Sequence, residues 1–418
     1  MPGQLLRVVT AGSVDDGKST LVGRLLHDAK AVLADQLTAV EVASERRGYD
    51  GADLALLVDG LRAEREQGIT IDVAYRYFAT ANRTFVLADT PGHVQYTRNT
   101  VTGASTADVA VILVDARNGV LDQTKRHAAV AALLRVEHVV LAVNKMDLVD
   151  YSEPVFDSIV GDFAAAAASL GLDTFTPIPV AALGGDNVVE RSSRMSWYAG
   201  PSLLEHLEGI ESTPAAEVPA RFPVQMVVRP RSAEHPDYRG YAGRVEAGTL
   251  HAGDPVVVLP SGRTSAVAGI DTPDGALDEA APGRSVVVRL EDDIDIARGD
   301  LIAVDRDPRP TVVRSLTATV CWLAEQPLRA GDRFALRHGT RDIPAVVDAV
   351  ETRLDITTLK HDQSDELQLN DIGAIRLRTA EPVPVDPYQL NRSTGAFLLV
   401  DEDGGATVAA GMVAAPSE

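Results

Sequence analysis

The stretch Gly12-Ser13-Val14-Asp15-Asp16-Gly17-Lys18-Ser19 matches the phosphate-loop pattern G-x-x-x-x-G-K-[ST]. It follows the apolar run Leu5–Ala11, which predicts a short buried strand, and it opens a stretch that predicts a helix. In this context the glycines let the backbone wrap a phosphate group, and the helix N-terminus supplies positive potential. We therefore expect Lys18 to reach the β- and γ-phosphates of a nucleotide and Ser19 to bind Mg²⁺. A Gly-rich turn without a ligand is the alternative, and the strand–loop–helix context disfavours it.

Further along the first half of the chain, short apolar runs alternate with longer amphipathic stretches. Lengths of four to seven residues and enrichment in β-branched side chains predict strands over 85–88, 109–114 and 139–143. The stretches 122–134 and 153–170 predict helices between them. This alternation predicts an α/β domain with a mostly parallel sheet and helices on both faces.

Two further motifs follow predicted strands of this sheet. Asp89-Thr90-Pro91-Gly92-His93 follows strand 85–88, where an Asp at a strand end holds a metal ion through water and a Gly offers its N–H to a γ-phosphate. Asn144-Lys145-Met146-Asp147 follows strand 139–143. The Asp147 carboxylate can accept from the two donors of guanine, N1–H and N2–H₂, whereas adenine would leave it unpaired. A surface Asn-Lys turn is the alternative, and the order of the three motifs disfavours it.

The pattern changes near residue 210, after a polar, Pro-containing linker over 211–220. Beyond the linker, short β-branched runs separated by Gly, Pro and Asp turns predict two all-β barrel domains. A Leu-x-Ala-Gly-Asp pattern recurs at 250–254 and 328–332, and predicts a Gly-Asp turn that leads into a strand in each barrel. The predicted domains are therefore 1–210, 211–309 and 310–418.

The composition limits where the chain is expected to act and which partners it is expected to bind. Its 418 residues carry 39 Lys and Arg against 60 Asp and Glu, a net charge of −21, which argues against a non-specific nucleic-acid or anionic-membrane binder. The one cysteine, Cys321, excludes a disulfide framework. Since no apolar run of about 18 residues and no signal-like segment is present, we expect a cytoplasmic protein without a membrane span.

The three motifs and their spacing resemble the GTPases of the translation-factor class. The resemblance implies GTP and Mg²⁺ as ligands, and Thr70, in Gln67-Gly68-Ile69-Thr70-Ile71, as a switch residue that contacts Mg²⁺ and the γ-phosphate. His93 stands where this class has the residue that orients the attacking water. The resemblance implies three sets of residues. The nucleotide set is Gly12, Ser13, Val14, Asp15, Asp16, Gly17, Lys18, Ser19, Thr20, Asp89, Thr90, Pro91, Gly92, His93, Asn144, Lys145, Met146, Asp147, Ala181, Ala182 and Leu183; the catalytic set is His93, Lys18 and Thr70; the metal set is Ser19, Thr70 and Asp89.

The base-contacting loop resembles that of the class but lacks one hydroxyl. Where the class usually has Ser-Ala-Leu, this chain has Ala181-Ala182-Leu183, so a side-chain contact from the first residue is absent. The backbone N–H of Ala182 is still expected to meet the O6 atom of guanine.

Within this class, the chain resembles the large, GTP-hydrolysing subunit of bacterial sulfate adenylyltransferase. The similar stretches are 12–20, 53–78, 89–99, 119–124, 144–152, 185–189 and His338-Gly339-Thr340-Arg341. The resemblance implies a heterodimer or larger assembly with a smaller catalytic subunit, which forms adenosine 5′-phosphosulfate and diphosphate from ATP and sulfate. GTP hydrolysis on this chain would then drive that uphill reaction.

Two other functions fit the same fold. An elongation factor that delivers aminoacyl-tRNA is the stronger rival, but such factors usually have His where this chain has Asp16. A signalling GTPase is the other, and the two additional β domains disfavour it.

Overall fold

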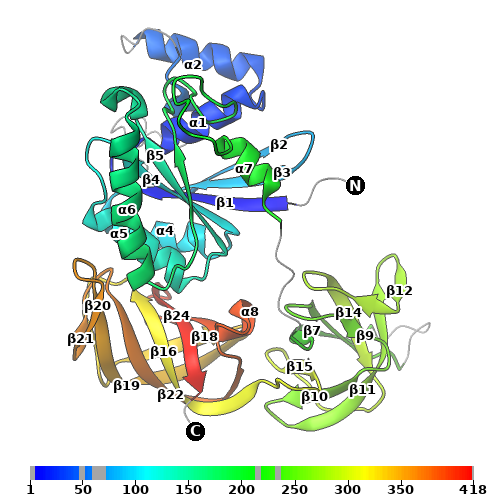
Figure 1. Cartoon of the computed structure of the whole chain (residues 1–418). Coiled ribbons are helices and arrows are strands. Elements are labelled where there is room, and N and C mark those ends of the chain that lie inside the picture. The colour runs from blue at the N-terminus through cyan, green and yellow to red at the C-terminus, as the bar shows by residue number, and fades with distance from the viewer. Residues whose placement is uncertain (1–4, 47–51, 59–71, 212–217, 231–236, 417–418) are drawn as a thin grey trace. The chain divides into compact units, whose positions relative to one another are not determined.

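A computed structural model describes residues 5–46, 52–58, 72–211, 218–230 and 237–416 (Figure 1). The contacts within the chain divide it into two compact units. The first consists of Met1–Glu211 with Asp355–Lys360, and the second of Ser212–Leu354 with His361–Glu418.

The first unit is built on a six-stranded sheet in the order β2-β3-β1-β4-β5-β6. All neighbouring strands are parallel except the edge strand β2, which runs antiparallel to β3. The strands are β1 (Leu5–Gly12), β2 (Ala74–Ala79), β3 (Thr84–Asp89), β4 (Val109–Asp115), β5 (His138–Asn144) and β6 (Thr176–Pro179). The order runs outward from β1 in both directions, which creates a crevice at the carboxyl ends of the central strands.

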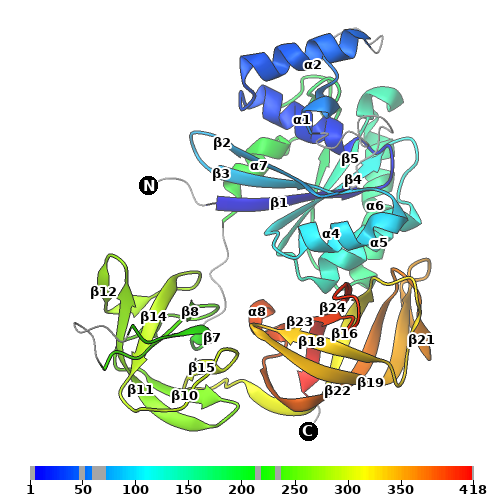
Figure 2. The same ribbon diagram turned by 180° about the vertical axis from the view of Figure 1, so that it is seen from behind.

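Helices cover both faces of this sheet (Figures 1 and 2). Along β4 the side chains alternate: Val111 and Leu113 belong to one apolar core, and Ile112 and Val114 belong to the other. Helices α1 and α7 contribute to the first core, and α5 and α6 contribute to the second. The helices are α1 (Lys18–Asp28), α2 (Ala34–Arg46), α4 (Thr97–Ala104), α5 (Asp122–Leu133), α6 (Glu153–Ser169) and α7 (Leu203–Gly209). The predicted α/β fold with a mostly parallel sheet is confirmed.

The second unit contains two seven-stranded sheets, and in each sheet the first strand also pairs with the sixth, which closes six strands into a β-barrel. Closure leaves no free edge among these strands. The first barrel follows the order β10 (Pro255–Leu259), β15 (Leu301–Val304), β7 (Arg221–Val228), β8 (Gly240–Arg244), β14 (Ser285–Leu290) and β11 (Arg263–Thr272). The second follows the order β18 (Arg333–His338), β23 (Ala396–Val400), β24 (Thr407–Pro416), β16 (Thr311–Trp322), β22 (Ile372–Val385) and β19 (Arg341–Asp355). The predicted all-β barrels are confirmed, and the exact domain limits at 210 and 309 remain predictions.

The recurring Gly-Asp turn has the same structure in both barrels. The Asp254 carboxylate accepts the His251 N–H at 2.8 Å, and the Asp332 carboxylate accepts the Arg329 N–H, also at 2.8 Å. The preceding glycines have φ values of 89° and 94°, in the left-handed region that favours glycine. The aspartate therefore holds the turn that only the glycine allows.

Candidate functional site

The residues singled out in the sequence lie on loops at one edge of the six-stranded sheet. Parallel strands place their carboxyl ends together, and β1, β3, β4 and β5 end at Gly12, Asp89, Asp115 and Asn144. Thr10 of β1 lies opposite Asp89 of β3, and Asp115 of β4 lies opposite Asn144 of β5. In open α/β sheets, ligands bind at this edge, next to the strand where the order changes direction.

The phosphate loop is closed around the side chain of Lys18. The Nζ atom donates to the carbonyl oxygens of Gly12 and Ser13 at 3.0 and 2.7 Å, and the residue is 7% exposed. Burial lowers the pKa of Lys18, against the opposing effect of nearby carboxylates such as Asp89 and Asp16. There is no room for a side chain at position 92, because a Cβ atom on Gly92 would lie 2.5 Å from Lys18 Nζ. Gly92 thus brings its backbone directly over the phosphate loop.

The two described members of the predicted metal set are in contact. The Ser19 hydroxyl donates to Asp89 Oδ2 at 2.8 Å, and the Thr10 hydroxyl donates to Oδ1 of the same carboxylate at 2.7 Å. Asp89 is fully buried. A hydroxyl and a carboxylate side by side are the oxygen ligands that Mg²⁺ prefers. The third member of the set, Thr70, lies outside the described residues, as does Ile69.

His93 lies half-buried immediately after Gly92. Its ring packs edge-on against Tyr96, with 6.3 Å between the ring centroids. Val14, a member of the predicted nucleotide set, is 38% exposed in the phosphate loop. Thr90 and Pro91 are buried, and the Thr90 hydroxyl donates to the Thr10 carbonyl at 2.6 Å, so its side chain holds the strands together.

The base-reading motif is bonded to both neighbouring loops. Asn144 Nδ2 donates to the Asp16 carbonyl at 2.8 Å, and Asn144 Oδ1 accepts the Ala182 N–H at 3.0 Å. Asp147 is half-buried in the short 3-10 helix η3 (Met146–Val149). The Met146 side chain is fully buried in the apolar core, so only its backbone faces the loop region. Ala181 and Ala182 are buried, whereas Leu183 is 72% exposed.

Two supporting residues, Asp115 and Arg24, were not recognised in the sequence. Asp115, at the end of β4, pairs with Lys145 at 3.0 Å and with Arg117 at 2.6 Å. Burial alone would raise the pKa of Asp115. Hydrogen bonds from Arg117 and Lys145 nevertheless hold this pKa well below its usual range. Arg24 of α1 donates to the carbonyl oxygens of Ala182 and Leu183. The one signal for Asp115 was its place at a strand end, and Arg24 carried none.

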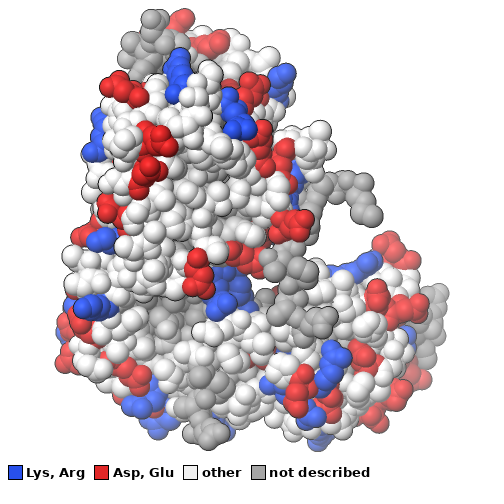
Figure 3. Space-filling model, in the orientation of Figure 1, with Lys and Arg blue, Asp and Glu red and all other residues white. Residues whose placement is uncertain are grey.

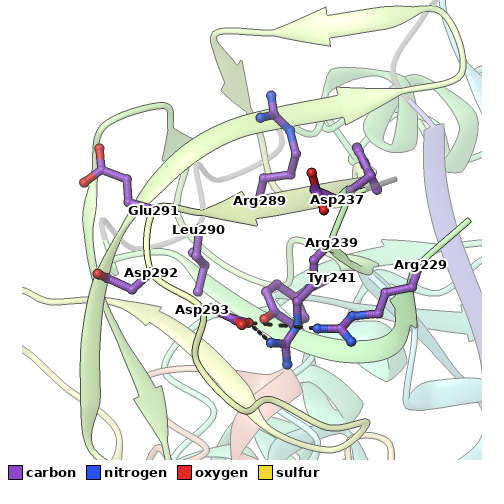
Figure 4. A pocket seen from close by; sticks show the side chains of 10 residues that line it. Arg229, Asp237, Arg239, Tyr241, Arg289, Leu290, Glu291, Asp292 and Asp293 are labelled. Carbon is purple, nitrogen blue, oxygen red and sulfur yellow. Dashed lines mark hydrogen bonds and ion pairs between the residues drawn. The ribbon is translucent and has the colours of Figure 1, made fainter. Parts of the chain in front are cut away.

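A polar pocket of about 570 Å³ lies on the first barrel (Figure 4). It contains none of the predicted site residues. Arg229 and Arg239 both reach toward Asp293, which is 80% exposed, and Arg289 pairs with Asp271 at 2.8 Å. The guanidinium groups of the pocket are thus engaged by carboxylates of the same barrel. The acidic residues Glu291, Asp292 and Asp293 also line the pocket.

Charged side chains of both signs mix on the face of the molecule drawn in Figure 3. No helix among the described residues is long and apolar enough to cross a membrane.

Two family models match the chain. The model described as "Elongation factor Tu GTP binding domain" matches residues 3–213, about half of the chain. The model described as "GTP-eEF1A C-terminal domain-like" matches residues 315–414. These ranges correspond to the sheet domain and to the second barrel.

Curated relatives match nearly the whole chain. It is 54% identical over 412 residues to the bifunctional enzyme CysN/CysC of Mycobacterium tuberculosis, a match that covers 98% of this chain and 67% of the relative. It is 50% identical over 412 residues to sulfate adenylyltransferase subunit 1 of Aeromonas hydrophila, with 98% and 86% covered. The subunit 1 of Cellvibrio japonicus is 49% identical over 413 residues, again with 98% and 86% covered. The resemblance stated from the sequence is confirmed.

Proposed function

The chain belongs to the sulfate adenylyltransferase subunit 1 family, and we propose that it hydrolyses GTP to drive adenylyl sulfate formation by a smaller partner subunit. The observation that carries the proposal is the set of loops at the carboxyl edge of the sheet. Lys18, Asp89 and Asn144 come from three separate motifs. Lys18 bonds to carbonyl oxygens within the phosphate loop, and hydrogen bonds connect Asp89 and Asn144 to the same loop. The comparisons do not favour the delivery of aminoacyl-tRNA.

The phosphate loop and the end of β3 fit a triphosphate with a divalent cation. Lys18 and the backbone N–H groups of residues 13–18 would bind the β- and γ-phosphates. Ser19, Asp89 and Thr70 would hold Mg²⁺, which when bound offsets the negative charge of the phosphates. The contact between Ser19 and Asp89 supports a polar ligand at this loop. So does the buried Ser13 hydroxyl, which has no hydrogen-bond partner among the described residues.

Guanine would be read by the loops after β5 and β6. The Asp147 carboxylate would accept from N1–H and N2–H₂ of the base. The Ala182 N–H, which donates to Asn144 Oδ1, would have to share its hydrogen with the O6 atom to contact the base. Asn144 joins these loops to the phosphate loop, and the apolar stem of Lys145 would cover the ring. Ala181 has no hydroxyl, so the contact of this loop with the base would come from the backbone alone.

Hydrolysis would need a water molecule held in line with the γ-phosphate. His93 would orient this water, and the Gly92 N–H would bind a γ-phosphate oxygen. The stretches 46–71, which contains Thr70, and 93–99, which begins at His93, would act as switch segments. When the γ-phosphate leaves, their contacts would change, and this change would reach the partner. Such a signal suits an uphill reaction, because the anhydride of phosphate and sulfate is a high-energy product.

The proposal is tested by two measurements on the full chain. Titration calorimetry should detect GDP binding by the wild type, and Lys18→Ala should abolish it. Mixed with the smaller subunit, the chain should raise ATP- and sulfate-dependent diphosphate release when GTP is added. Absence of GDP binding, or diphosphate release that does not respond to GTP, would contradict the proposal. Recovery of tRNA with the purified chain, in place of a catalytic subunit, would favour the rival function.

A further inference from the structure

The carboxylate of Asp16 lies inside the phosphate loop, and its residue is 2% exposed. Its Oδ2 atom accepts the Ser13 N–H at 2.6 Å, and the Asp16 N–H donates back to the Ser13 carbonyl at 3.4 Å. These two bonds close residues 13–16 into a ring through a local side-chain contact. Both bonds are made by groups of the loop itself, so the ring restrains the shape of residues 13–16 from within the chain.

The same residue joins the phosphate loop to the base-reading loops. The Asp16 carbonyl accepts Asn144 Nδ2 at 2.8 Å, and Asn144 Oδ1 accepts the Ala182 N–H. The fit is close, because a Cβ atom on Gly17 would lie 2.5 Å from Asn144 Nδ2. A continuous path of hydrogen bonds therefore runs from Ser13 through Asp16 and Asn144 to Ala182.

A buried carboxylate is a costly group to place in a loop that binds phosphate. Burial raises the pKa of Asp16, although Lys18 and the Ser13 N–H act in the opposite direction. The carboxylate would also repel the phosphates of a nucleotide. The charge of the Asp16 carboxylate disfavours both its own burial and the binding of a phosphate group. Its contribution must therefore come from its position, which lets it accept the Ser13 N–H.

We propose that Asp16 is a positioning residue, whose carboxylate pre-forms the phosphate loop through Ser13 and aligns it with the guanine-reading loops. The inference rests on the proposed nucleotide site. A pre-formed loop spends less free energy on ordering when a ligand binds, and this gain is the same for GDP and GTP. Asp16 should thus affect nucleotide affinity and leave the chemical step nearly unchanged.

Three variants separate geometry from charge. Asp16→Ala leaves a buried N–H without an acceptor, and should raise the Kd for GDP and the KM for GTP about ten-fold, with kcat within about three-fold of the wild type. Asp16→Asn keeps an oxygen acceptor without the charge, so its affinities should stay within about three-fold. Asp157→Ala removes an exposed carboxylate from α6 and is the matched control.

The constants are measured on the full chain, by GDP titration and by phosphate release from GTP. Equal losses in Asp16→Ala and Asp16→Asn, a lower kcat at unchanged KM, or no loss in Asp16→Ala would each overturn the inference. Absence of GDP binding by the wild type would instead overturn the proposed function, and the inference with it. Amide exchange in the nucleotide-free wild type needs no variant: a slowly exchanging Ser13 N–H supports the ring, and exchange as fast as at exposed Asp15 contradicts it.

Discussion

The choice between guanine and other bases depends on one carboxylate in this site. Asp147 follows Asn144, which the structure anchors to Asp16 and Ala182, so the side chain is presented from a fixed loop. Asp147→Asn replaces one acceptor oxygen by a donor that faces the guanine donors. Affinity for GDP should fall by about 2–3 kcal/mol, on the order of 100-fold, and affinity for xanthosine diphosphate should rise. Competition titrations with both nucleotides measure the change, and an unaltered preference for guanine would contradict the role of Asp147.

His93 should affect the hydrolysis of GTP and spare its binding. The ring lies half-buried against Tyr96, beside the glycine that covers the phosphate loop. His93→Ala removes the polar ring that would orient water, so GTP hydrolysis should slow by about 10²–10⁴-fold. GDP affinity, measured by titration, should stay within about two-fold, because ground-state contacts are retained. A hydrolysis rate equal to that of the wild type would remove His93 from the mechanism.

At the scale of elements, helix α1 stabilises the base-reading loop as well as the phosphate loop. Arg24, about 1.7 turns after Lys18, donates to the carbonyl oxygens of Ala182 and Leu183. Arg24→Met keeps the apolar stem but releases both carbonyls, and should weaken GDP binding about five- to ten-fold, on the order of 1 kcal/mol. Lys30→Met, which removes an exposed cation near the end of α1, is the control. A loss of equal size in the control would mean that charge, and not the loop contact, explains the effect.

The helices and strands were predictable because residues next to each boundary determine where the element begins and ends. The runs 109–114 and 139–143 are followed by Asp115 and Asn144, and the observed strands extend the predicted ones by one residue, at one end of β4 and at both ends of β5. Motif order also placed Lys18, Asp89 and Asn144 at one sheet edge. By contrast, Arg24 meets Ala182 across 158 positions of sequence, and no local pattern records such a contact. The same holds for the pairing of Asp115 with Lys145, which depends on neighbouring strands in the folded sheet.

At the scale of the whole molecule, a buried ion pair joins the two barrels of the second unit. Arg221 and Asp386 are both fully buried, with 3.0 Å between Arg221 Nε and Asp386 Oδ2. Arg221 also donates to the carbonyl oxygens of Pro219 and Pro308, and Asp386 accepts the Thr394 hydroxyl at 2.5 Å. Removing one member would leave an uncompensated buried charge, which costs about 3–5 kcal/mol in such pairs. The sequence alone did not distinguish Arg221 and Asp386 from other charged residues, because a local pattern does not show which residues another domain will bury.

Buried histidines should make the stability of the molecule sensitive to acid. His127 of α5 is 2% exposed, and its Nδ1 atom has no partner among the described residues. Burial, with smaller effects from Lys18 and Arg126, lowers the pKa of His127 to about 3. Burial also lowers the pKa of His338 in the second barrel. Since the unfolded chain takes up a proton near pH 6.5 and the folded chain does not, the free energy of unfolding falls as the pH decreases from about 6.5 toward 3.

At pH 5 this effect should amount to about 2 kcal/mol for His127 relative to neutral pH. Urea unfolding of the full chain at several pH values between 5 and 7.5 measures it. His127→Gln removes the titrating group, so the slope of unfolding free energy against pH should decrease by up to one proton, whatever the variant's stability at pH 7.5. His361→Gln is the control, because that exposed side chain is solvated in the folded and unfolded states alike. If His127→Gln and wild type lose stability in parallel as the pH falls, the buried imidazole is not the group that responds, and its proton must enter the folded protein freely.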